Sequence, residues 1–105
     1  MARRLSWSPE AIEDIEAIAS YIGRDSRVYA RIVAARIVET ASEIVRFPLS
    51  GRVVPEVGDT DLRERFVYSY RVMYRVLSDR VLVIAVVHGS RLLDTLADAI
   101  AERQT

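Results

Sequence analysis

The chain has 105 residues, half of them apolar, which is enough for one domain with its own core and too few for a second domain. It contains no cysteine and a single histidine, His88, so disulfides, cysteine-based metal sites and multi-histidine metal sites are excluded. The formal net charge is zero, which argues against a general nucleic-acid-binding protein, and we expect no cofactor.

The first half of the chain predicts a strand followed by two helices. Arg3–Trp7 has the pattern of a short strand, and Ser8 and Pro9 are typical of a helix start. We expect a helix from Pro9 to Ile22 that Gly23 caps at its C-terminus, and after a tight turn at 24–26 a second helix to about Phe47, before Pro48. Apolar residues form one arc of each helix: Ala11, Ile12, Ile15, Ile18, Ala19 and Ile22 in the first, and Ala30, Val33, Ala34, Ile37, Val38, Ala41, Ile44 and Val45 in the second. Tyr29, Ile32 and Ala35 fall off the second arc and predict a small exposed apolar patch.

The second half predicts a loop, three strands and a short helix. A loop is expected over Leu49–Asp61, a strand over Leu62–Val67, a half-buried strand over Tyr70–Val76 and a strand buried on both faces over Val81–Val87. A terminal helix from about Arg91 would carry Leu92, Leu93, Leu96, Ala97 and Ile100 on one arc. The predicted order is β-α-α-β-β-β-α, an α+β fold in which a helical hairpin packs on one face of an antiparallel sheet.

No segment predicts membrane insertion or export. The longest apolar run, Val81–Val87, is far shorter than the roughly 20 residues that span a bilayer, and the N-terminus lacks the apolar stretch of a signal peptide. We therefore expect a cytoplasmic protein with no membrane partner.

Basic residues concentrate in the middle of the chain, and all of them are arginine. Arg63, Arg65, Arg71 and Arg75 lie on adjacent predicted strands, where they could form a basic face for phosphate or an acidic protein segment. Alternatively they form an ordinary solvated face and pair with Glu64 and its neighbours, and the sequence leaves open which of them share a face. Arg52, after Gly51, is either presented by the loop or simply solvated.

His88 stands at the end of the apolar strand, just before Gly89 and Arg91. A strand end followed by a glycine-containing turn is a common place for functional residues, and histidine transfers protons near neutral pH. The alternative is a structural histidine that bonds loop backbone.

Several stretches, taken in order, resemble the RelE/ParE superfamily of toxins, and within it the ParE branch. They are Trp7-Ser8-Pro9-Glu10-Ala11, Asp14-Ile15, Tyr21-Ile22, the run from Phe47 to Arg52, Leu62-Arg63-Glu64-Arg65, the run from Tyr70 to Val76, and the run from Val87 to Arg91. The resemblance covers nearly the whole chain, from Leu5 to about Leu93, and that family's fold agrees with the predicted order of elements.

The resemblance implies that the chain is a type II toxin, held inactive by a cognate antitoxin that carries the operator-binding domain, so that the toxin itself does not bind DNA. ParE-type toxins poison DNA gyrase, whereas RelE-type relatives cut messenger RNA on the ribosome. If this chain were a nuclease, the candidate catalytic residues would be His88, Arg91 and Arg65. It lacks the lysines and C-terminal tyrosine of the nucleases, which favours gyrase. A non-toxic relative that only binds its antitoxin is the third alternative.

Overall fold

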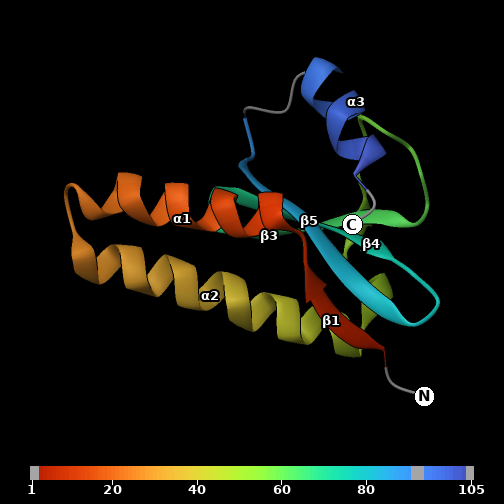
Figure 1. Cartoon of the computed structure of the whole chain (residues 1–105), viewed down its shortest axis with the longest axis horizontal. Helices are drawn as coiled ribbons and strands as arrows, with labels where there is room; N and C mark the ends of the chain where they lie inside the picture. The colour runs from red at the N-terminus through yellow and green to blue at the C-terminus, as the bar shows by residue number, and fades with distance from the viewer. Residues whose placement is uncertain (1–2, 91–93, 104–105) are drawn as a thin grey trace.

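The computed structural model of the chain describes residues 3–90 and 94–103. Its elements follow in the order β1 (Arg4–Trp7), α1 (Pro9–Gly23), α2 (Arg27–Arg46), the 3-10 helix η1 (Pro48–Ser50), β2 (Arg52–Val53), β3 (Leu62–Val67), β4 (Tyr70–Val76), β5 (Arg80–His88) and α3 (Asp94–Glu102). Helices α1 and α2 lie side by side as a hairpin, and α3 lies apart from them beyond β5 (Figure 1). The predicted α+β class and helical hairpin are confirmed.

The sheet has five strands in the order β1-β5-β4-β3-β2. The predicted antiparallel meander of β3, β4 and β5 is confirmed, with Met73 opposite Glu64 on one side and Ala85 on the other. The sheet as a whole is mixed, however, because β1 runs parallel to β5. Part of the predicted loop is also ordered, since Arg52 and Val53 pair with β3 as the edge strand β2.

A serine side chain caps the N-terminus of each hairpin helix. The Ser8 hydroxyl accepts the Ala11 N–H at 3.1 Å, and the Ser26 hydroxyl accepts the Tyr29 N–H at 3.1 Å. The predicted cap at Gly23 is wrong, because Gly23 is still helical and Arg24 follows it in a right-handed helical conformation. No left-handed residue is needed there, since the chain passes directly into the turn before α2.

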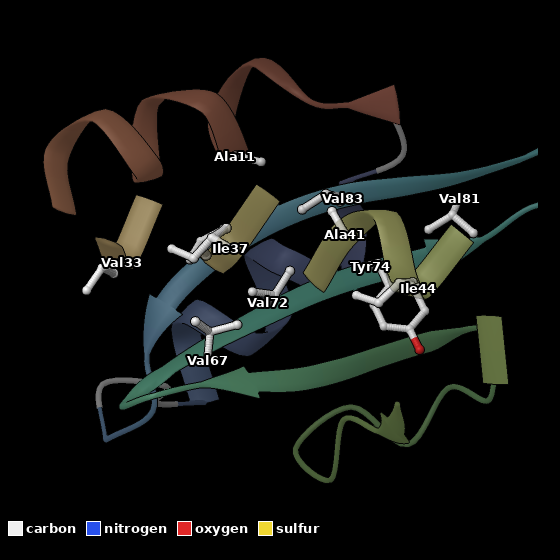
Figure 2. Close-up of a cluster of buried hydrophobic side chains, with 11 residues drawn as sticks. Ala11, Val33, Ile37, Ala41, Ile44, Val67, Val72, Tyr74, Val81 and Val83 are labelled. Carbon is white, nitrogen blue, oxygen red and sulfur yellow. The ribbon is translucent and has the colours of Figure 1, made fainter. Parts of the chain in front are cut away.

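The first core lies between the hairpin and the sheet. Figure 2 shows Val33, Ile37, Ala41 and Ile44 of α2 facing the strands, with Ala11 contributed by α1. Two residues expected in this core, Ile12 and Val38, are about half exposed at 48% and 50%. They stand at the margins of their apolar arcs, which are wider than the strip of each helix that the sheet and the neighbouring helix cover.

A second core lies on the opposite face of the sheet, where the sequence indicated only that the strand over Val81–Val87 is covered; the burial of that strand on both faces is confirmed. Met73, Leu82 and Ile84 pack there with Val54 of the loop and Ile100 of α3. Strand β4 is therefore buried on both faces over Val72–Arg75, and not half-buried as its alternation predicted. Burial of Ile100 agrees with the predicted terminal helix, while the side chains of Leu92, Leu93, Leu96 and Ala97 lie outside the described residues.

Tyr74 anchors the segment that leads into β2. Its hydroxyl donates to the Pro48 carbonyl at 2.7 Å and accepts the Gly51 N–H at 2.9 Å. A Cβ atom at Gly51 would stand 2.5 Å from that hydroxyl and 2.6 Å from the Glu64 carbonyl oxygen. Only glycine fits so close an approach, and this contact sets the position of Arg52.

Candidate functional site

The strand arginines divide between the two faces of the sheet. Side chains alternate along β3, so Arg63 and Arg65 share the hairpin face with Val67. Arg65 donates to Glu43 of α2 at 3.0 Å, and Arg63 donates to the Gly51 carbonyl at 3.0 Å. Arg71 and Arg75 belong to the opposite face, so the four arginines do not form one basic surface.

A buried carboxylate, that of Glu64 on β3, lies on the opposite face of the sheet. The Glu64 side chain is completely buried and pairs with Arg52 at 2.7 Å and with Arg71 at 3.2 Å. Arg71, only 11% exposed, also pairs with Glu56 at 2.9 Å. Hydrogen bonding to Arg71 holds the pKa of Glu56 below its ordinary value, so the pair stays charged. Most of the positive charge on this face is neutralised within the chain.

Two further contacts complete this face. Phe66, about half exposed, lies beneath the Arg52 and Arg71 guanidinium groups, 5.3 and 5.8 Å from its ring centre. Arg75 pairs with Asp59 at 3.1 Å and donates to the Ala101 carbonyl of α3 at 2.8 Å. Arg75 therefore joins the loop before β3 to the terminal helix.

His88 faces the other way, on the hairpin side of the sheet. Its ring meets the Tyr70 ring edge-on at 5.6 Å, and its Nδ1 atom is 2.7 Å from the Ser90 hydroxyl. Arg65 lies on the same face and forms an ion pair with Glu43 of α2. Arg91 lies outside the described residues. The structure thus separates His88 from Arg71 and Arg75 and brings it together with aromatic side chains instead.

These aromatic side chains line an open groove between α1 and the end of the sheet. Its main part, of about 540 Å³, is bounded by Asp14, Ile18, Tyr21, Tyr70 and His88. A second part, of about 390 Å³, continues past Tyr21, Tyr70 and His88 to Tyr29 and Tyr68. We call the two parts together the aromatic groove. Four of the five tyrosines of the chain line it: Tyr21, Tyr29, Tyr68 and Tyr70.

Tyr68 is held in a strained position at the rim of the aromatic groove. Its φ of 52° is in the left-handed region, which bulky residues rarely adopt. The ring is 56% exposed and lies 6.3 Å from the ring of Tyr29. Tyr68 and Ser69 form the two-residue turn between β3 and β4, because Val67 pairs with Tyr70, and such tight hairpin turns require a positive φ at their first position.

Asp14 of α1 contributes a carboxylate to the lining of the aromatic groove. Its carboxylate accepts the Val86 N–H at 2.9 Å, at a point where β5 extends beyond the end of β1. Burial raises the pKa of Asp14 above its ordinary value of 3.8, although the Val86 hydrogen bond opposes this. Sequence reasoning found Tyr29 but missed Tyr21, Tyr68 and Asp14, because their proximity depends on tertiary packing and not on spacing in the chain.

Over residues 3–90 and 94–103 no three metal-ligating side chains come together, and none of the described helices is long and apolar enough to cross a membrane. Tyr29 and Ile32 are exposed, as predicted, at 47% and 48%. Tyr29 lies against Tyr68, and Ile32 stands one turn further along the same helix, so the two remain neighbours on its surface.

Comparison with known proteins places this geometry in a family. The profile of "ParE toxin of type II toxin-antitoxin system, parDE" matches residues 5–93. Toxin RelE2 of Caulobacter vibrioides is 31% identical over 87 residues, 82% of this chain and 94% of that toxin. The chromosomal ParDE system of P. aeruginosa gives a TM-score of 0.69 at 18% identity, over 83% of this chain and 96% of that one. A mutant of E. coli toxin RelE in the free state also gives 0.69, at 17% identity, over the full length of both chains.

The structural likeness establishes the fold, and the profile match and the curated relative establish the family. Both cover most of the chain, and they agree on the class of protein. The chain therefore belongs to the RelE/ParE superfamily and is a toxin of the ParE/RelE family of type II toxin–antitoxin systems.

Proposed function

We propose that this toxin acts without catalysis, by binding and inhibiting DNA gyrase, and that a cognate antitoxin neutralises it. The resemblance to the ParE branch supports the target. The observation that supports this choice of mechanism is that three strand arginines are paired with carboxylates within the chain. Arg65 pairs with Glu43 on the face of His88, and on the opposite face Arg71 and Arg75 pair with Glu56, Glu64 and Asp59.

Cleavage of RNA at neutral pH needs a base for the 2′-hydroxyl, an acid for the leaving oxygen and cations around the phosphate. Among the described residues, His88 supplies the one imidazole, the side chain that most often acts as general acid or base in enzymes. The arginines that could surround a phosphate on the opposite face already pair with Glu56, Glu64 and Asp59. This arrangement supports a binding protein over a nuclease.

A ribosome-dependent nuclease is the second candidate. It is favoured by the 31% identity to the Caulobacter toxin RelE2 and by the TM-score of E. coli RelE, which equals that of the ParDE system. A relative that binds an antitoxin but is no longer toxic is the third.

Expression in cells without antitoxin distinguishes the three. Gyrase inhibition predicts blocked replication and a DNA-damage response, with bulk messenger RNA intact. His88→Ala should then reduce toxicity only modestly, and Arg4→Ala, at an exposed position on β1, serves as the control. Codon-phased cleavage of ribosome-bound messenger RNA that folded His88→Ala abolishes would establish the nuclease. Normal growth with abundant folded toxin would establish the non-toxic relative.

We also propose that the antitoxin segment covers the aromatic groove, with Tyr29 as one anchor. Exposed tyrosines at a groove supply contact area at a low entropic cost, and they are enriched at protein interfaces. The antitoxin would carry the DNA-binding domain, so the toxin itself would not touch DNA. Arg52, Arg63 and Arg65 remain proposed contacts. Arg71 and Arg75 remain proposed as well, but their side chains are only 11% and 10% exposed and could contribute little contact area.

The product of the neighbouring reading frame is the protein to test as antitoxin, by isothermal titration. Tyr21→Ala and Tyr29→Ala should each weaken binding at least tenfold, as expected for interface anchors, while Glu16→Gln on the exposed side of α1 should not. Unchanged affinity in both tyrosine variants would remove the groove as the docking site. Reversing the charge of Arg71 and Arg75 is a poorer test, because it breaks intrachain ion pairs.

A further inference from the structure

The outer side of α2 carries apolar side chains that nothing in the described chain covers. Val28, Ile32 and Val38 are 67%, 48% and 50% exposed, and Ala35 between them is exposed as well. Helix α2 forms one margin of the molecule in Figure 1. Single exposed apolar residues are ordinary, but these four lie within eleven consecutive residues of one helix.

These residues form a continuous stripe with the spacing of a helix–helix contact. Val28, Ala35 and Ser42 are seven residues apart, and the intervening exposed positions 31, 32, 38 and 39 fall three or four residues from them. Ala35 stands at the centre and has the smallest side chain, so a second helix could approach closely there. We call the surface formed by these seven positions the α2 stripe: Val28, Arg31, Ile32, Ala35, Val38, Glu39 and Ser42.

The α2 stripe is complementary to itself. A two-fold axis at Ala35 relates residues at equal distances before and after it. Two antiparallel copies would therefore bring Val28 to the level of Ser42, and Ile32 to the level of Val38.

The same axis sets Arg31 of one copy at the level of Glu39 of the other. Both side chains are exposed, and within residues 3–90 and 94–103 neither has an ion-pair partner. A parallel arrangement would instead bring Arg31 against Arg31 and Glu39 against Glu39. Charge complementarity thus selects one partner and one orientation.

We propose that the α2 stripe is a self-association surface, on which a second copy of this chain packs its own α2 antiparallel about Ala35. The surface is separate from the aromatic groove and from the face that carries Arg71 and Arg75, so a dimer leaves both accessible. The inference does not depend on the proposed function. One helix face buries less than the roughly 800 Å² per partner of a standard interface, so the dimer should be weak, with a dissociation constant on the order of 100 µM.

Cysteine cross-linking tests the geometry, because the natural chain has no cysteine to interfere. Ala35→Cys places the two introduced thiols at the two-fold axis, within the roughly 6 Å Cα separation that a disulfide spans. Mild oxidation at 100 µM should give a covalent dimer within minutes. Ser20→Cys, exposed on α1, should remain monomeric. Equal cross-linking of the two variants, or none at Ala35, would overturn the proposal.

Charge exchange tests the partner and the orientation by sedimentation velocity between 5 and 500 µM (concentrations chosen about the expected constant). Arg31→Glu and Glu39→Arg should each weaken association at least fivefold, and the double variant should restore it to within about twofold, because the opposite charges face each other again. Arg24→Glu, at an exposed position in the turn before α2, controls for net charge, and circular dichroism checks folding. Failure of the double variant to restore association, or a monomer at every concentration, would overturn the proposal.

Discussion

Replacement of Glu64 by glutamine removes one negative charge from the most buried ion pair of residues 3–90 and 94–103, and it leaves the side-chain shape nearly unchanged. Loss of one partner from a buried pair costs about 3–5 kcal/mol when the other charge is left alone. Here Arg71 keeps Glu56 at 2.9 Å, and Arg52 is 55% exposed to solvent. We therefore expect Glu64→Gln to lower the free energy of unfolding by about 2–3 kcal/mol.

Urea unfolding followed by circular dichroism measures this loss, with Glu16→Gln on the exposed side of α1 as the matched control, expected to change stability by less than about 0.5 kcal/mol. The double variant Glu56→Gln with Glu64→Gln leaves Arg71 without a carboxylate. Its loss should exceed the sum of the two single losses by about 1 kcal/mol. A change below about 0.5 kcal/mol for Glu64→Gln, or strict additivity, would refute the view that these carboxylates jointly neutralise Arg71.

Three further predictions concern packing and titration. Ile37→Ala, at a fully buried position, should cost about 2–5 kcal/mol in a denaturant melt, and Ile15→Ala, only partly buried, should cost less; the reverse order would mean that the helix faces are misassigned. Gly51→Ala must displace the Tyr74 hydroxyl and should lower stability by more than Tyr74→Phe, which removes the same hydrogen bonds without a clash; a harmless Gly51→Ala would contradict the close approach. The pKa of Asp14 is raised in the folded protein, so folding favours the protonated carboxyl and disfavours the charged one. The stability that the protonated carboxyl contributes is fully present below pH 3.8, the ordinary pKa, and is lost as pH rises through the raised pKa. Asp14→Asn should therefore be more stable than the natural chain at pH 7, and this difference should shrink toward pH 3 in paired thermal melts; a difference that grows toward acid would reverse the sign.

Local signals in the sequence accounted for the helices and for the meander. Ser8 and Ser26 have the side chains that cap helices, and the unbroken apolar run around Val83 has the pattern of a central strand. The direction of β1 was not predictable from its four residues, because the same short strand could join β5 in either orientation. The second core was also missed, since the alternation of Arg71, Met73 and Arg75 is typical of a solvated face until the loop and α3 cover it.

The candidate site was less predictable than the fold because it depends on which side chains meet across elements. The sequence offered Glu64 as a partner for the arginines but not which arginines it would reach. Only the register of β3 with β2 and β4 sets Glu64 opposite Arg52 and Met73, between two guanidinium groups. The aromatic groove depends in the same way on the packing of α1 against the end of β5, which no spacing in the chain reveals.

The most direct test of the proposed mechanism is a side-by-side assay of the purified toxin, free of antitoxin, on DNA gyrase and on translating ribosomes. We expect the toxin to inhibit gyrase supercoiling at a concentration comparable to that of the enzyme, with accumulation of cleaved DNA, and to leave ribosome-bound messenger RNA uncut. Codon-phased messenger RNA cleavage, with gyrase unaffected at the same toxin concentration, would contradict it.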